Sequence, residues 1–274
     1  VNPVARVRWT PRKGPAPKQV KLFIRLRRPD TRITATGDGG GALARIDLAY
    51  RNTLTSRNES DRVTVGDDPD ERFVEVCERI VSLNPGCDAV AAGDGLICDL
   101  PVTEAGSGIK WRLVWAAHVG EPVLRVKKGN QICDATFRYC AHWAGLDEVM
   151  TEAIETRDDR LARSRLFEKV IEQASLDMAQ RHLLNQSFQA WLSNCFWCDL
   201  NRDGGRPDEW FSVWAGSCLF HSPIDVEYNV ALLYLAIWPQ LLKMQLCQWA
   251  EHEQNHGPSG GSFLSHDLGQ GPSA

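Results

Sequence analysis

The chain has 274 residues, of which 43% are hydrophobic and 24% are charged, and its formal net charge is -4. This hydrophobic content is sufficient for a real core and excludes an intrinsically disordered chain. The acidic balance, without any run of five or more Lys or Arg, gives no electrostatic field that attracts nucleic acid, so we expect no nucleic-acid partner.

Two further absences in the sequence bear on where the protein acts. No apolar run reaches about 18 residues and the N-terminus has no hydrophobic signal core, so we expect no integral membrane segment and no export. The nine cysteines are scattered, which favours free thiols in a reducing cytoplasm. Because the chain begins at Val1 without an initiator Met, we expect a fragment of a longer protein.

The first half of the chain has the pattern of strands. From Val4 to about Lys128, β-branched runs alternate with turn-forming clusters such as GDGGG at Gly37 to Gly41, which predicts an antiparallel β-sandwich. Asp70 to Leu83 is an exception, since its apolar residues fall at helical spacing and predict a helix. The runs that predict strands are VARVRW, KLFIRLRR, RITAT, ALARIDLAY, RVTV, LICDL and IKWRLVW.

From about Asp134 onward the apolar residues follow the period of helices. Three such stretches are followed by a fourth after Asp225, where the nine successive residues from Val230 to Trp238 are all apolar; we expect that helix to be buried on every side. The fold class is therefore α+β, with a β-sandwich domain over residues 1–130 and a helical domain over residues 131–274. The first three stretches are Trp143 to Ile154, Leu161 to Ile171 and Leu176 to Leu192.

The start of the fourth helix carries the candidate site. His221, Asp225 and Glu227 stand where a turn enters an apolar helix, and we expect them at the rim of a cavity. Trp210 and Trp214 precede them, and an indole face stacks well on a sugar ring. Carboxylates beside indole rings are typical of sugar-binding sites, so we expect a carbohydrate or glycoside as the partner.

The order of motifs resembles the non-lysosomal glucosylceramidase and β-glucosidase family and its β-xylosidase relatives. The motifs are NQSFQAWLSN, WFSVWAGSCLFHSPIDVEYN, WPQLLKMQLCQWA and SFLSHDLG, in that order along the chain. The resemblance implies that the helical part is an incomplete (α/α) toroid of six hairpins. It also implies a retaining β-glycosidase without a cofactor, which uses two carboxyl groups about 5 to 5.5 Å apart.

The resemblance also assigns individual positions. It implies a nucleophilic Glu just before Gly216, where this chain has Ala215, and a general acid downstream of Ala274. It places Asp225 against the sugar hydroxyls and His266 with Asp267 on a loop beside them. We therefore expect sugar binding without catalysis, and Asp225 and Glu227 are the only nearby carboxylates that offer a catalytic alternative.

Other interpretations of the same residues stay open. Asp225 can instead cap the helix, Glu227 can be an acid of the first helical turn, and His221 can be an imidazole at the edge of the core. An amidase-like hydrolase would have to use Ser217 or Cys218 with His221 as the base.

A metal site is a further alternative. Cys195 and Cys198 form a CxxC motif, but no second pair at metal spacing follows, so we expect a helix end there and no metal. The sequence leaves the oligomeric state open.

Overall fold

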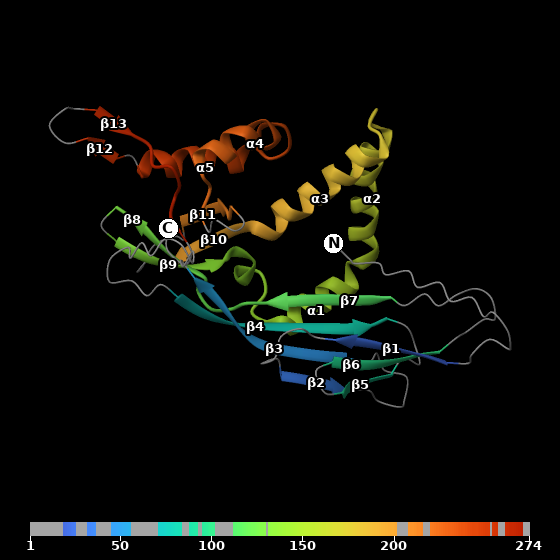
Figure 1. Cartoon of the computed structure of the whole chain (residues 1–274). Coiled ribbons are helices and arrows are strands. Elements are labelled where there is room, and N and C mark those ends of the chain that lie inside the picture. Colours follow the sequence, from blue (N-terminus) through green and yellow to red (C-terminus); the bar gives the residue numbers. More distant parts are fainter. Residues whose placement is uncertain are drawn as a thin grey trace. The chain divides into compact units, whose positions relative to one another are not determined.

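The computed structural model describes residues 19–25, 32–36, 45–55, 71–83, 88–92, 95–101, 112–129, 131–201, 208–215, 220–252, 254–256 and 261–270 (Figure 1). The predicted strands VARVRW and RVTV and the predicted turn GDGGG lie outside these residues. The chain divides into two compact units. Unit 1 comprises Val1–Asn52, Glu75–Val119 and Trp143–Leu161, and unit 2 comprises Thr53–Val74, Gly120–His142 and Ala162–Ala274.

The N-terminal strands form two sheets. One has the order β1-β6-β5 and the other the order β2-β3-β4-β7 (Figure 1). The strands are β1 (Gln19–Arg25), β2 (Arg32–Thr36), β3 (Arg45–Thr55), β4 (Glu71–Ser82), β5 (Asp88–Ala92), β6 (Gly95–Pro101) and β7 (Leu113–His118). The chain thus has the mixed α+β character that the sequence predicts, with antiparallel pairing of β1 with β6, β5 with β6, β2 with β3, and β4 with β7.

The helix predicted over Asp70 to Leu83 is wrong, because this segment is the strand β4. Strand β4 lies between β3 and β7 in its sheet. Ile80 and Val81 are adjacent in sequence and point to opposite faces, yet only 3% and 6% of their surfaces are exposed. A strand that is buried on both faces loses the simple alternation of apolar and polar residues, so its short apolar run is easily mistaken for a helical pattern.

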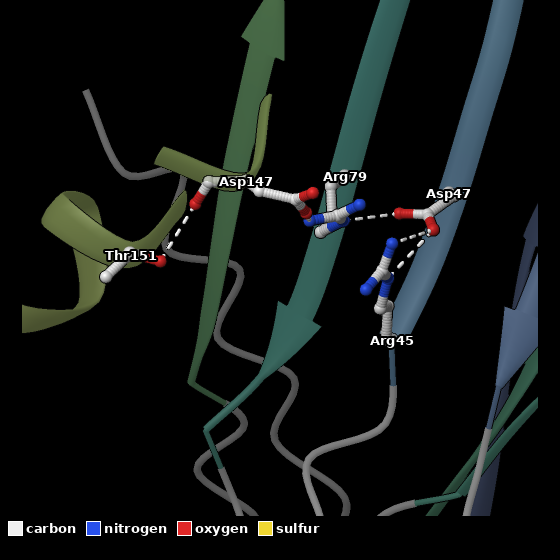
Figure 2. A network of polar contacts seen from close by, with 5 residues as sticks. All are labelled: Arg45, Asp47, Arg79, Asp147 and Thr151. Carbon is white, nitrogen blue, oxygen red and sulfur yellow. Dashed lines mark hydrogen bonds and ion pairs between the residues drawn. The ribbon is translucent and has the colours of Figure 1, made fainter. Parts of the chain in front are cut away.

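The helix α1 (Leu146–Glu155) packs on one face of the β2-β3-β4-β7 sheet. Its buried Met150 joins Val81, Val114 and Ala116 in an apolar cluster. Beside this cluster, Arg79 of β4 reaches both Asp47 of β3 and Asp147 of α1 (Figure 2). The buried guanidinium of Arg79 thus joins the helix to the sheet through two carboxylates. These carboxylates accept hydrogen bonds from guanidinium N–H groups that would otherwise be buried without a partner.

Unit 2 contains a four-stranded antiparallel sheet in the order β11-β10-β9-β8. Its strands are β8 (Leu124–Lys128), β9 (Gln131–Phe137), β10 (Cys195–Asn201) and β11 (Asp208–Val213). The helical segment expected from Asp134 therefore begins with strand and the short helix η1 (Arg138–Ala141). The predicted domain boundary between residues 130 and 131 falls between the strands β8 and β9, which pair with each other.

The predicted helices are confirmed as elements. They are α2 (Arg157–Gln173), α3 (Met178–Asn194) and α4 (Ile224–Ile237), after α1, and they are followed by α5 (Pro239–Glu251) and the hairpin β12 (Gln254–His256) and β13 (Gly261–Phe263). Helix α3 begins with a capping box between Asp177 and Gln180, which satisfies two orphan backbone groups. Among the described residues, no helix has the length and apolar character needed to cross a membrane.

The expectation that α4 is buried on every side is wrong. Its Tyr234 is fully buried against Phe211 and Leu241, but Tyr228 and Leu232 are 80% and 77% exposed. Helix α4 therefore covers the core with one side only. The helix also ends earlier than the apolar run, since Pro239 is the first residue of α5 and lacks the N–H that a continuous helix needs.

Helix α5 is attached to the edge of the sheet by a buried glutamine. The Gln248 side chain accepts a hydrogen bond from the Phe211 backbone N–H at 3.1 Å and donates one to the Phe211 carbonyl at 3.0 Å. This amide takes the place of a neighbouring strand at that point of β11, so both backbone groups of Phe211 remain satisfied in the interior.

The ion pairs of Arg79 give a stability prediction. Asp47→Asn should lower the free energy of unfolding by about 1 to 3 kcal/mol, because Arg79 then keeps only one charged partner. Asp147→Asn should cost less than about 1 kcal/mol, since the Asp147 side chain is 82% exposed. Urea unfolding of the two variants measures both values. Equal losses would show that Asp47 is not the main partner of Arg79.

The ion pair of Arg79 with Asp47 also predicts that the stability of the fold depends on pH. Burial raises the pKa of Asp47, but the hydrogen bonds from Arg45 and Arg79 outweigh burial and hold it below the usual value of 3.8. A lowered carboxyl pKa stabilises the fold above pH 3.8, and this contribution is lost as the pH falls through the folded-state pKa. The stability difference between the wild type and Asp47→Asn should therefore shrink in acid.

Candidate functional site

The predicted site lies at the turn between β11 and α4. Trp214 and His221 form an isolated β-bridge, and the Ala215 N–H donates to the Phe220 carbonyl at 2.8 Å. The chain thus leaves β11 and returns beside it before α4 begins. Residues 216–219, which include Ser217 and Cys218, lie outside the described residues.

His221 is the buried centre of this turn. Its side chain is fully buried, and its ring Nδ1 lies 3.0 Å from Ser212 Oγ. The ring packs edge-on against Phe196 and tilts against Trp214, each at 5.4 Å between centroids. A ring enclosed in this way is shielded from solvent, so the geometry favours the interpretation of His221 as a core imidazole.

The backbone of His221 holds a distant segment in place. Its N–H donates to the Gly269 carbonyl, and its carbonyl accepts from the Leu268 N–H, both at 2.8 Å. Phe220 forms a further β-bridge with Gln270. The loop that contains the HDLG motif is therefore paired with the residues just before α4, although more than forty positions separate them in the sequence.

The backbone conformation at two positions shapes this contact. Ser222 has a φ of 45° and Gly269 a φ of 139°, which are both left-handed values that glycine adopts easily and serine does not. The Ser222 hydroxyl accepts from the Val213 N–H at 3.0 Å and from Gln245 Nε2 at 3.1 Å. These contacts offset the conformational cost and fix the direction in which α4 starts.

The start of α4 and the HDLG loop together form a polar cluster, which we call the His266 cluster: Asp225, His266 and Asp267. Asp225 and His266 are exposed, whereas the side chain of Asp267 is only 21% exposed. His266 Nδ1 lies 3.0 Å from Asp267 Oδ2, and His266 Nε2 lies 3.8 Å from Asp225 Oδ1. A hydrogen bond of 2.8 Å from the Ile224 N–H to the His266 carbonyl fixes the two segments to each other. The structure therefore brings together three of the residues that the sequence singled out.

The position expected for a nucleophile is connected to this cluster. Ala215 bonds to the backbone of Phe220, and the Phe220 ring meets the His266 ring edge-on at 5.4 Å between centroids. Sequence reasoning missed Phe220, because only the bridge to Gln270 makes its position significant. No feature of the sequence near Phe220 signals that pairing.

The other predicted residues are buried or half-buried. Glu227 is only 2% exposed and lies inside the protein between α4 and α5. Trp214 is half-buried and packs on Phe196 and His221. Trp210 is 2% exposed and donates from its indole N–H to Ser212 Oγ, so its face does not stack on a ligand.

The interpretation of Asp225 as a helix cap is wrong. The residue at the cap position of α4 is Pro223, and no side chain caps this helix start. Asp225 is in the first helical turn, and its side chain is 73% exposed. An acid in the first turn interacts favourably with the helix dipole, and the carboxylate remains available to a ligand.

The helix end expected at the CxxC motif is present, because Cys195 is the C-cap residue of α3. Strand β10 begins at the same residue and contains both Cys195 and Cys198. Residues three apart on a strand point to opposite faces, so these two thiols do not face a common ligand. In the described part of the chain, no group of three or more His, Cys, Asp or Glu side chains is arranged to hold a metal ion.

Comparison with known proteins does not assign the chain to a family. No protein-family model matches the chain, and a search of the curated proteins gives no significant match.

Proposed function

We propose that this chain is a carbohydrate-binding protein of the retaining β-glycosidase lineage, which binds a sugar at the His266 cluster and does not cleave it. The observation that carries the proposal is the convergence of the exposed Asp225 and His266 with the partly buried Asp267. These three residues come from two distant segments, and the resemblance to glucosylceramidases implies that both segments border one sugar.

The chemistry of the cluster supports a ligand rich in hydroxyl groups. The exposed carboxylate of Asp225 accepts hydrogen bonds from two neighbouring hydroxyls, and a charged acceptor makes such bonds roughly twice as strong as a neutral one. His266, which is 59% exposed, adds a group that donates or accepts. The Phe220 ring beside His266 supplies an apolar surface of the kind on which the C–H face of a sugar packs.

The absence of cleavage follows from the position of Ala215. A retaining mechanism needs a carboxylate that forms a covalent glycosyl intermediate, and an alanine methyl group cannot do so. Glu227 does not replace it, since its carboxyl group is enclosed between α4 and α5. Catalysis, the second candidate function, therefore depends on Asp225 alone among the candidate carboxylates.

Binding is tested by one substitution at the exposed carboxylate. Asp225→Asn should weaken the binding of a glucose- or xylose-shaped azasugar by about tenfold or more, because the charged acceptor is lost. The melting temperature should change little, because a first-turn acid contributes only about 0.3 to 1 kcal/mol. Isothermal titration calorimetry and thermal unfolding measure the two effects.

A matched control is Asp158→Asn, which removes another exposed acid from the first turn of a helix, here α2. This variant should bind the azasugar as the wild type does. Equal affinity of the wild type and Asp225→Asn, or no binding by either protein, would contradict the proposed sugar site.

Cleavage is tested separately with chromogenic substrates. Purified wild-type protein should release no 4-nitrophenol from 4-nitrophenyl β-glucoside or β-xyloside above the rate in buffer, because the nucleophile position is Ala215. Asp225→Ala is the control for contaminating enzymes, whose activity would be the same in both preparations. Turnover by the wild type that disappears in Asp225→Ala would overturn the proposal and assign a catalytic role to Asp225.

A further inference from the structure

An exposed tryptophan lies on strand β7 of the β2-β3-β4-β7 sheet. Burial alternates along this strand, and Trp115 is 49% exposed between the buried Val114 and Ala116. Val114 and Ala116 pack with Met150 of α1. Because successive side chains of a strand point to opposite faces, Trp115 lies on the face of the sheet that is turned away from α1.

A carboxylate on the neighbouring strand holds the indole in one orientation. Trp115 Nε1 donates to Glu78 Oε2 of β4 at 2.9 Å, and the Tyr50 hydroxyl of β3 donates to Glu78 Oε1 at 2.5 Å. Strands β3, β4 and β7 are consecutive in the sheet, so two aromatic side chains flank one carboxylate in a row across three strands. We call this row the Trp115 platform: Tyr50, Glu78 and Trp115.

The exposed part of Trp115 is apolar ring. In the register of β4 and β7, Trp115 pairs with Ile80, which is only 3% exposed. Paired residues of antiparallel strands place their side chains next to each other on one face, so the sheet accounts for the buried half of the indole. The polar N–H is already bonded to Glu78, and the exposed half is therefore an apolar surface in a fixed position.

The chemistry of the Trp115 platform matches that of a sugar. An indole face is a good packing surface for the C–H groups on one side of a pyranose ring. Each oxygen of Glu78 accepts one hydrogen bond within the platform, and a carboxylate has about four acceptor positions. A sugar stacked on Trp115 thus has a charged acceptor beside it for its hydroxyl groups, whereas the same charge repels phosphates and other anions.

We infer that the Trp115 platform is a binding site for an uncharged oligosaccharide. Three adjacent strands span about 10 Å, which exceeds the width of a single pyranose ring, so the ligand is a chain of sugars. The platform lies in unit 1, whereas the His266 cluster lies in unit 2. The inference therefore adds a second site and does not rest on the proposed function.

The test measures the binding of cellohexaose and xylohexaose by calorimetry. Every protein carries Asp225→Asn, so that the His266 cluster does not contribute, and the Asp225→Asn chain is the reference. Adding Trp115→Ala should weaken hexasaccharide binding by about tenfold or more, because the stacking surface is lost. Adding Phe23→Ala is the control and should leave the affinity unchanged, since Phe23 is another exposed ring of unit 1, 53% exposed and on β1.

Three results would overturn the inference. They are equal affinity with and without Trp115→Ala, no binding of either hexasaccharide by the reference chain, and tighter binding of choline than of the hexasaccharides. The choline result would identify a cation site, because an indole beside a carboxylate also attracts a quaternary ammonium ion. The azasugar test of Asp225 uses a different ligand and different residues, so the two proposals succeed or fail separately.

A second variant decides the matter if Trp115→Ala does not fold. Ala117 is exposed on β7 two residues after Trp115, so both side chains are on the same face. An arginine at this position can stack on the indole, and Ala117→Arg should therefore weaken hexasaccharide binding by about threefold or more. A folded Ala117→Arg chain that binds as tightly as the reference chain would overturn the inference.

Discussion

The two backbone hydrogen bonds of His221 are the constraint on which the candidate site depends. They pair the end of the β11 turn with Leu268 and Gly269, and together with the hydrogen bond from Ile224 to His266 they fix the HDLG loop relative to α4. The imidazole supports this pairing from inside, because its contacts with Phe196, Trp214 and Ser212 hold the turn in the core. His221, which the sequence offered as a sugar-binding residue, thus holds the HDLG loop in place through its backbone.

The arrangement separates two kinds of carboxylate within one helical turn. Asp225 and Glu227 are two positions apart on α4 and point in different directions, so the former is exposed and the latter is enclosed. The exposed group is free to accept hydrogen bonds from a ligand. The enclosed group instead belongs to a network with Gln245, Tyr234 and Ser222 that fixes α4 against α5. The proposed binding group and the structural network thus share one segment.

The sequence predicted the helices and strands better than it predicted how deeply each of them is buried. Helices α1 to α4 and most of the N-terminal strands follow directly from local periodicity. Strand β4 was mistaken for a helix because it is buried on both faces, and β10 was missed because Phe196 and Trp197 follow a helix without a break. The burial of α4 was overestimated, since apolar composition does not tell how many neighbours a helix has in the fold.

In the candidate site, too, the tertiary contacts could not be predicted from the local sequence. The juxtaposition of Asp225 with His266 and Asp267 was expected only from the resemblance to glucosylceramidases, since no local rule links residues forty positions apart. The burial of His221 and Glu227 depends on side chains from Ser212, Phe196 and Gln245, and such tertiary contacts are not visible in a local pattern. The cap position of α4 was misjudged by two residues, because Ser222 takes a left-handed conformation just before Pro223.

A crystal structure of the chain with a glucose-shaped azasugar is the most direct test of this account. The account predicts electron density for the sugar at the start of α4, with its hydroxyl groups within hydrogen-bond distance of the Asp225 and Asp267 carboxylates and its ring near Phe220. It also predicts that His221 makes no contact with the ligand. Density at another surface, with the His266 cluster left empty at saturating ligand, would contradict the assignment of this turn as a sugar site.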